Sequence, residues 1–205
     1  MSKPLTMKDL QNQINELKAE LSEIKKEKIP TIKKKLEIGD TFELAGLNWK
    51  ILDITEKGYV CLADKLKDES KFDSNSNDWK ESSLRSYLNG EFLGVLREEI
   101  GEENILSFER DLLALDGLDE YGKCEDYVSL LNIDEYRKYR KRIPNTDYYW
   151  WLLTADSVKS NGDNSWVSVV RPSGGILSTS VAATAALVFA QFVSFLLQSL
   201  NQRNR

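Results

Sequence analysis

The sequence predicts an α+β domain over residues 37–205, preceded by a separate helix and linker over residues 1–36. Three observations support this class. Apolar residues recur every three or four positions near the N-terminus, short β-rich runs begin near residue 38, and amphipathic helical segments interrupt those runs. With 41% hydrophobic and 30% charged residues over 205 positions, the composition is that of a folded protein with its own core.

The N-terminal segment has the spacing of a short coiled coil. Its apolar residues fall at heptad positions a and d, namely Met7, Leu10, Ile14, Leu17, Leu21 and Ile24. Because this seam lies outside the predicted core, we expect a homo-oligomer formed through residues 7–24 rather than a helix packed on its own domain. Pro30 ends the helix, and residues 33–37 form a charged linker.

The domain itself alternates strands, loops and helices. We expect a meander of two or three strands over 38–63, a polar loop at 68–77, a helix opening at Ser82 and a second short helix at 98–106. After a loop-rich stretch, a charged helix starts at Asn132. The run TDYYWWLLT then predicts a strand buried on both faces, and WVSVVRPSGGILSTSV predicts a hairpin.

Several functional classes are excluded or disfavoured by composition. The chain has no His, which removes Ser-His-Asp and Cys-His nucleophiles and imidazole metal ligands. Cys61 and Cys124 form no C-x-x-C motif and are either two buried thiols or one disulfide. A net charge of −5 argues against nucleic-acid binding. We expect no metal, no cofactor and no catalytic residues, since the acidic clusters are typical of solvated faces.

The N-terminus is polar from the start, so we expect no signal peptide and synthesis in the cytoplasm, with a virion as one destination. An apolar tail leaves one membrane alternative open: a tail anchor with a C-terminal helix over residues 181–200. Its length is near the lower limit for a span, and Gln191 and Ser194 fall near its middle, so a membrane role is disfavoured.

Four motifs in order carry a family resemblance. They are LNWKILDI at 47–54, NDWKESSLRSYLNGEF at 77–92, LLNIDEY at 130–136 and YWWLLT at 149–154. This layout, over roughly residues 43–166, resembles a bacterial and phage domain of unknown function that looks like the variable proteins of diversity-generating retroelements. The chain departs from that family at its end, where relatives close with a G-V-R-P-A type strand and this sequence has VFAQFVSF.

The resemblance implies a C-type lectin fold, related to that of formylglycine-generating enzymes, and a ligand-binding protein rather than an enzyme. In such proteins, adenine-directed mutagenesis rewrites AAY codons, which never become Lys, Glu, Gln, Met or Trp. Residues 167–190 contain none of these five types, as expected for a variable region at about 157–190. An apolar core segment would also tend to lack Lys and Glu. The related enzymes use a cysteine pair near the C-terminus, where this chain has none.

The expected hypervariable surface binds a protein or cell-surface ligand. By strand alternation, Val167 and Val169 point inward and the neighbouring positions point outward. No cluster of Asp, Glu and Asn suggests a sugar-binding calcium site in this segment. The expected ligand-binding residues are Ser168, Val170, Arg171, Ser173, Ile176, Ser178, Ser180, Ala182, Ala183, Thr184, Ala185, Leu187 and Phe189.

Overall fold

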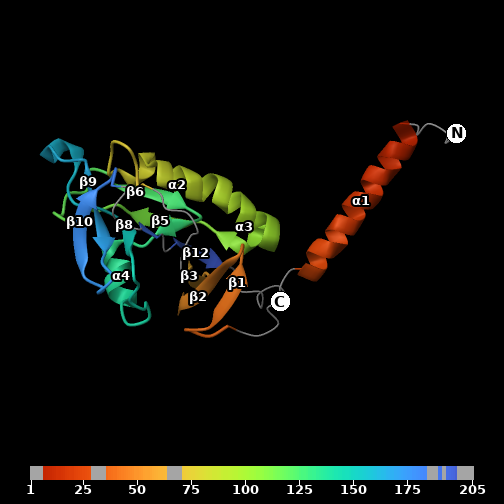
Figure 1. Ribbon diagram of the computed structural model, residues 1–205, viewed down its shortest axis with the longest axis horizontal. Coiled ribbons are helices and arrows are strands. Elements are labelled where there is room, and N and C mark those ends of the chain that lie inside the picture. The colour runs from red at the N-terminus through yellow and green to blue at the C-terminus, as the bar shows by residue number, and fades with distance from the viewer. Residues whose placement is uncertain (1–6, 29–35, 64–70, 184–188, 191–192, 198–205) are drawn as a thin grey trace. The chain divides into compact units, whose positions relative to one another are not determined.

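The computed structural model describes residues 7–28, 36–63, 71–183, 189–190 and 193–197. The chain divides into two units, Met1–Lys34 and Lys35–Arg205. Helix α1 (Met7–Lys28) forms the described part of the first unit, as the heptad spacing predicts. The second unit combines small, mostly antiparallel sheets with a few helices (Figure 1), so the α+β class is confirmed.

The first sheet joins strands from distant parts of the second unit. Its strands are β1 (Thr41–Leu44), β2 (Leu47–Ile54), β3 (Tyr59–Ala63), β4 (Ile105–Leu106), β7 (Ser129–Leu130) and β12 (Val193–Leu197). Strands β1, β2 and β3 are the predicted meander. Strand β12 pairs antiparallel with β3, β4 and β7, so the end of the chain completes this sheet.

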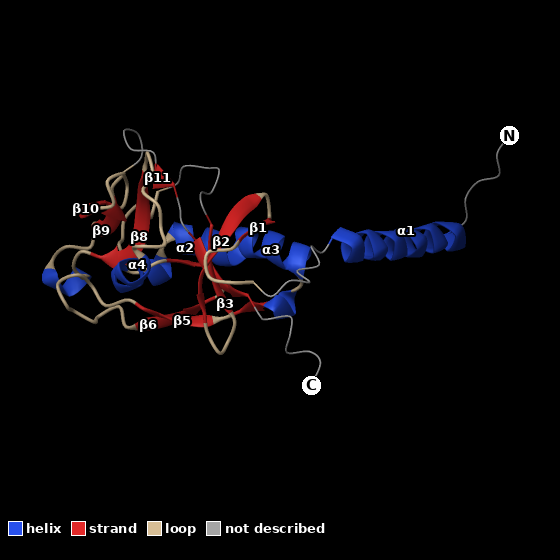
Figure 2. Ribbon diagram, turned by 90° about the horizontal axis from the view of Figure 1, so that it is seen from below, coloured by secondary structure: helices blue, strands red, loops and turns tan. Residues whose placement is uncertain are grey.

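The second sheet has the order β10-β9-β8-β11. Its strands are β8 (Tyr149–Ala155), β9 (Trp166–Val170), β10 (Ile176–Ser180) and β11 (Phe189–Ala190). Strands β8, β9 and β10 are antiparallel neighbours, whereas β11 runs parallel to β8. Both ribbon views place β8, β9 and β10 together at one end of the second unit, away from β1 (Figure 2). A separate hairpin consists of β5 (Phe108–Asp111) and β6 (Lys123–Asp126).

The predicted helix after Ser82 is present and longer than its apolar face suggested. The Ser82 hydroxyl caps its start by accepting from the Arg85 N–H. The segment comprises α2 (Ser83–Tyr87), a π turn (Leu88–Phe92) and α3 (Leu93–Ile100), preceded by a 3-10 turn (Trp79–Glu81). Further 3-10 turns are Glu102–Asn104 and Lys159–Asn161. The predicted helix at 98–106 is therefore wrong, because its residues divide among α3, a 3-10 turn and β4.

Helix α4 (Ile133–Tyr139) joins the two sheets. Asn132 and Glu135 form a capping box at its start, in which each side chain accepts from the other residue's backbone N–H. Its side chains enter a core cluster with both sheets: Leu52, Leu62, Leu131, Ile133, Tyr136, Tyr139, Ile143, Trp150, Leu152 and Val170. The predicted buried strand is confirmed, since Trp150 through Ala155 of β8 are all buried.

The alternative of a C-terminal helix over 181–200 is wrong. Val193–Leu197 forms β12, whose backbone pairs with strands on both sides, and a strand in mid-sheet cannot also belong to a spanning helix. The apolar residues of this segment suit a sheet with neighbours on both edges. Among the described residues, no helix has the length and apolar content that a membrane crossing requires.

Both cysteines are free thiols, which decides between the two alternatives left open by the sequence. Burial and the nearby Asp126 carboxylate raise the pKa of Cys124 to about 11, and Cys61 is buried.

We expect the native protein to react with a disulfide reagent at neutral pH roughly 100-fold more slowly than an ordinary thiol, because the thiolate is scarce. Timed thiol titration with and without denaturant measures this; rapid reaction of the native protein would contradict it.

Candidate functional site

The hairpin of β9 and β10 carries most of the predicted binding residues. Its register pairs Ser178 with Ser168 and Ser180 with Trp166. The turn closes through a bond from the Arg171 N–H to the Gly175 carbonyl, 2.8 Å, and Gly174 has a positive φ of 82° that favours glycine. The Tyr136 hydroxyl donates to the Gly174 carbonyl at 2.8 Å, so helix α4 fixes the position of the turn.

The predicted exposure of Ser168 and Val170 is wrong. All four residues at 167–170 are buried, with Ser168 at 0% exposure. Strand β9 lies between β8 and β10, and both faces of this sheet are covered. On one face Trp150, the cross-strand neighbour of Val170, packs edge-on against Tyr136 of α4. On the other face Trp151, the neighbour of Val169, contacts Phe72.

The structure places the remaining predicted positions differently from one another. Three are exposed, namely Arg171, Ser173 and Ala182. Four are half-buried, namely Ile176, Ser178, Ser180 and Ala183. Thr184, Ala185 and Leu187 lie outside the described residues. Phe189 is described through its backbone, which pairs with Tyr149 of β8. The structure therefore brings the exposed positions to the turn and to the far end of β10, with a buried strand behind them.

A neighbouring apolar surface escaped the sequence analysis. Trp166, at the start of β9, is 44% exposed, and three leucines of the loop after β5 are exposed to a similar degree: Leu113, Leu115 and Leu118. The Leu115 N–H donates to the Ala155 carbonyl at 2.9 Å, and the next residue, Asp156, donates its N–H to the Trp166 carbonyl at 3.0 Å. Ser178 of β10 donates to the Asp156 carboxylate. These bonds place the loop beside Trp166 and the exposed end of β10.

We call this combination the hairpin face, defined as Trp166, the exposed and half-buried positions of residues 171–183, and the three exposed leucines. A signal for the leucines was present in the sequence, because four leucines fall in a short Asp- and Gly-containing loop where polar side chains are usual. Contiguous exposed apolar side chains with a polar border are typical of protein contact surfaces. An exposed Trp is the side chain most often found at the energetic centre of such contacts.

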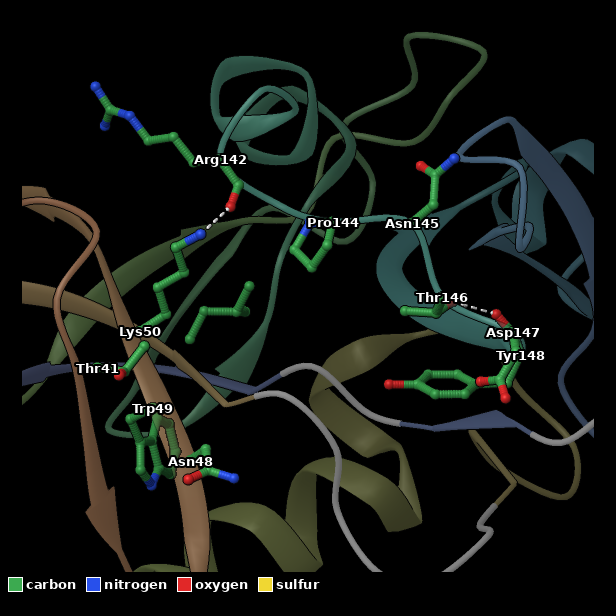
Figure 3. A pocket seen from close by; sticks show the side chains of 11 residues that line it. Thr41, Asn48, Trp49, Lys50, Arg142, Pro144, Asn145, Thr146, Asp147 and Tyr148 are labelled. Atoms are coloured by element: carbon green, nitrogen blue, oxygen red, sulfur yellow. Dashed lines mark hydrogen bonds between the residues drawn. The ribbon is translucent and has the colours of Figure 1, made fainter.

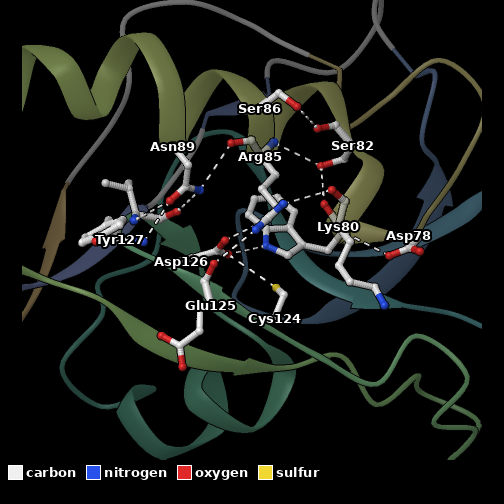
Figure 4. Close-up of polar contacts among 12 residues, drawn as sticks. Asp78, Lys80, Ser82, Arg85, Ser86, Asn89, Cys124, Glu125, Asp126 and Tyr127 are labelled. Carbon is white, nitrogen blue, oxygen red and sulfur yellow. Dashed lines mark hydrogen bonds and ion pairs between the residues drawn. The ribbon is translucent and has the colours of Figure 1, made fainter.

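Several residues of the four sequence motifs lie elsewhere and make contacts that stabilise the fold. Asp126 is buried and accepts from Trp79 Nε1 at 2.7 Å and from Arg85 Nε at 2.6 Å (Figure 4). Asn89 donates to the Val128 carbonyl and accepts from the backbone N–H groups of Tyr127 and Val128. These contacts bind the α2 segment to β6 and β7.

Two carboxylates that do belong to the motifs, Glu135 and Asp53, also make internal contacts. Glu135 binds Arg110, and Asp53 of β2 accepts from Lys138 Nζ and Tyr139 Oη, both at 2.9 Å. The bond from Lys138 lowers the pKa of Asp53 below its usual value despite partial desolvation. The motif side chains Trp79, Arg85, Asp53 and Glu135 are thus engaged in contacts within the second unit.

A cleft of about 410 Å³ opens between β1, β2 and the loop after α4 (Figure 3). Its lining is Thr41, Asn48, Trp49, Lys50, Leu62, Arg142, Pro144, Asn145, Thr146, Asp147 and Tyr148. The Lys50 ammonium donates to the Arg142 carbonyl at 2.8 Å, and the Arg142 guanidinium points away toward the Leu52 carbonyl. Because its cationic groups are already occupied by backbone carbonyls, the cleft is a weaker candidate than the hairpin face.

Among the described residues, the second unit is an α+β fold on which Trp166 and three leucines of the loop after β5 are exposed. Within the described residues, no three Cys, Asp or Glu side chains form a group suited to a metal ion. The chain matches no protein-family model, no curated protein and no solved structure.

The buried and exposed serines of the hairpin provide a direct test of this geometry. We expect Ser168→Lys to lower the free energy of unfolding by about 3 kcal/mol or more, because an ammonium group would be buried without a partner. The matched substitution Ser173→Lys, in the exposed turn, should change it by less than about 0.5 kcal/mol. Urea unfolding of both variants measures the difference, and equal losses would contradict the assignment.

Proposed function

We propose that this chain is a non-enzymatic ligand-binding protein in which the hairpin positions at residues 171–183 of the hairpin face are diversified by a retroelement. Its second unit would then have the C-type lectin fold. The observation that carries the proposal is the position of the segment lacking Lys, Glu, Gln, Met and Trp: its residues 171–183 supply the exposed turn and the half-buried edge strand β10 of the hairpin.

The residues that stabilise the fold are different from the exposed residues of the hairpin, and this separation supports the proposal. A protein that tolerates changing side chains needs a fold that does not depend on them. Here the buried tryptophans Trp49, Trp79, Trp150 and Trp151 lie outside the variable segment, as do the Asp126 and Glu135 contacts. Of the exposed hairpin positions, Ser173 and Ala182 have small side chains, whose replacement removes little packing.

Trp166 has a distinct role in this proposal. A Trp cannot arise from adenine-directed change of an AAY codon, so Trp166 is a constant residue at the border of the variable segment. Its ring and the neighbouring leucines supply apolar area for a protein or cell-surface ligand, while the variable positions select which ligand fits. Binding energy and specificity would then come from different residues of one surface.

A display library tests the proposal. Ser178, Ser180 and Ala182 are replaced by the fifteen residue types that AAY codons allow, and Thr41, Glu43 and Asn48 of β1 and β2 serve as a matched surface. Both libraries are selected against one immobilised test protein. We expect folded binders mainly from the hairpin library, and Trp166→Ala should weaken the selected binders about tenfold or more.

Two outcomes would contradict the proposal. The first is that most members of the hairpin library fail to fold, which would make these positions structural. The second is that selected binders keep their affinity after Trp166→Ala and arise equally from the β1 and β2 positions.

A further inference from the structure

Helix α1 exposes an apolar seam. Met7, Leu10, Ile14 and Leu17 are 84%, 43%, 45% and 63% exposed, and all four lie on the a and d positions of the heptad pattern. Most of the stability of helices in proteins comes from packing an apolar face rather than from intrinsic propensity. The seam therefore calls for a partner helix with the same spacing.

Charges beside the seam distinguish between the two orientations such a pair can adopt. With Met7 at position a, Lys18 and Lys25 fall at position e, and Glu20 and Glu27 fall at position g. In a parallel pair, position g of one helix lies beside position e of the following heptad in the other, so Glu20 meets Lys25. In an antiparallel pair, e meets e and g meets g, so like charges would meet.

We propose that α1 associates in parallel with α1 of further copies of this chain, with Glu20 of one copy paired to Lys25 of the next. Opposite charges then flank the seam on both sides, and every copy of the second unit begins from the same end of the bundle. The proposal extends beyond ligand binding and does not depend on which surface is variable. If the hairpin face does bind a ligand, several faces joined by one bundle would gain avidity.

Charge reversal in the full chain provides the test. Glu20→Lys alone places like charges at the g–e contact and should weaken association roughly tenfold, and Lys25→Glu alone should do the same. Mixing the two variants should restore association, because each then supplies the charge that the other lacks. Sedimentation equilibrium over a range of concentrations measures the mass of each sample.

A second variant reports orientation independently of charge. Leu10→Cys places a thiol at position d, and a parallel pair in register should form an interchain disulfide under mild oxidation. Native Cys61 is buried and Cys124 ionises weakly, so neither should compete. All five Trp residues lie outside α1, so the near-ultraviolet circular dichroism of the second unit checks that every variant remains folded.

The outcomes separate the alternatives. Tighter association after Glu20→Lys, without the Leu10→Cys disulfide, would indicate an antiparallel pair and overturn the proposal. A monomer at every concentration would overturn it as well, because the seam would then be covered by the same molecule. Neither result would bear on the hairpin library.

Discussion

Replacing Glu135 with alanine should lower the free energy of unfolding by about 3 kcal/mol or more. Its carboxylate accepts from both terminal nitrogens of Arg110, at 2.6 and 2.5 Å, and Arg110 is only 2% exposed. Without Glu135, the guanidinium would lose its paired carboxylate and keep its bond to the Leu130 carbonyl and its position over the Phe108 ring, which together do not neutralise a buried charge. Glu135 also accepts from the Asn132 N–H, so one of the two bonds of the capping box would be lost with it, while the bond from the residue-135 N–H to Asn132 would remain.

Asp134→Ala is the matched control, since it removes a carboxylate from the same first turn of α4. Asp134 pairs with Arg137 at the surface, and an exposed pair of this kind contributes under about 1 kcal/mol. Urea unfolding should therefore separate the two variants by at least about 2 kcal/mol. A difference below that would mean that Arg110 finds water or another acceptor when Glu135 is absent.

Asp126→Ala should lower the free energy of unfolding by a similar amount, about 3 kcal/mol. The buried carboxylate of Asp126 in β6 accepts from the Trp79 indole and the Arg85 guanidinium of the α2 segment. It also accepts from the Cys124 thiol of its own strand. Its removal would leave a buried indole N–H without an acceptor. The contact between the α2 segment and β6 would also be weakened.

The exposed neighbour Glu125 gives the control for this second substitution. Glu125→Ala leaves the Arg85 bond to the Glu125 backbone carbonyl in place and should change stability by less than about 0.5 kcal/mol. Thermal unfolding followed by tryptophan fluorescence measures both variants. Equal melting temperatures for the two would show that Asp126 is not the centre of this network.

Local patterns predicted the parts of the fold that depend on neighbouring residues. The Pro-Ser-Gly-Gly turn allowed the hairpin to be predicted, and the run at 149–155 was correctly assigned to a buried strand. The C-terminal strand could not be found in this way. A short apolar run suits a strand or a helix equally, and the choice at 193–197 depends on partners in β3, β4 and β7 that are distant in sequence.

The same limit applies to the candidate site. Alternation predicts exposure only for a sheet with one face in water, and β9 has Tyr136 on one side and Phe72 on the other. For this reason, the side chains of Ser168 and Val170 were wrongly predicted to be exposed. Leu115 is bonded through its backbone to Ala155, and Trp166 to the next residue, Asp156, an arrangement that no local spacing encodes.

The DNA flanking the coding region gives the most direct test of the variable-surface proposal. The proposal predicts a nearby near-copy of the codons from Trp150 onward, differing only at template adenines, with a reverse transcriptase gene beside it. Mismatched codons should map to the exposed hairpin positions and spare the codons of Trp166 and Ser168. Absence of both the near-copy and the reverse transcriptase gene, or mismatches concentrated at buried codons, would contradict the account.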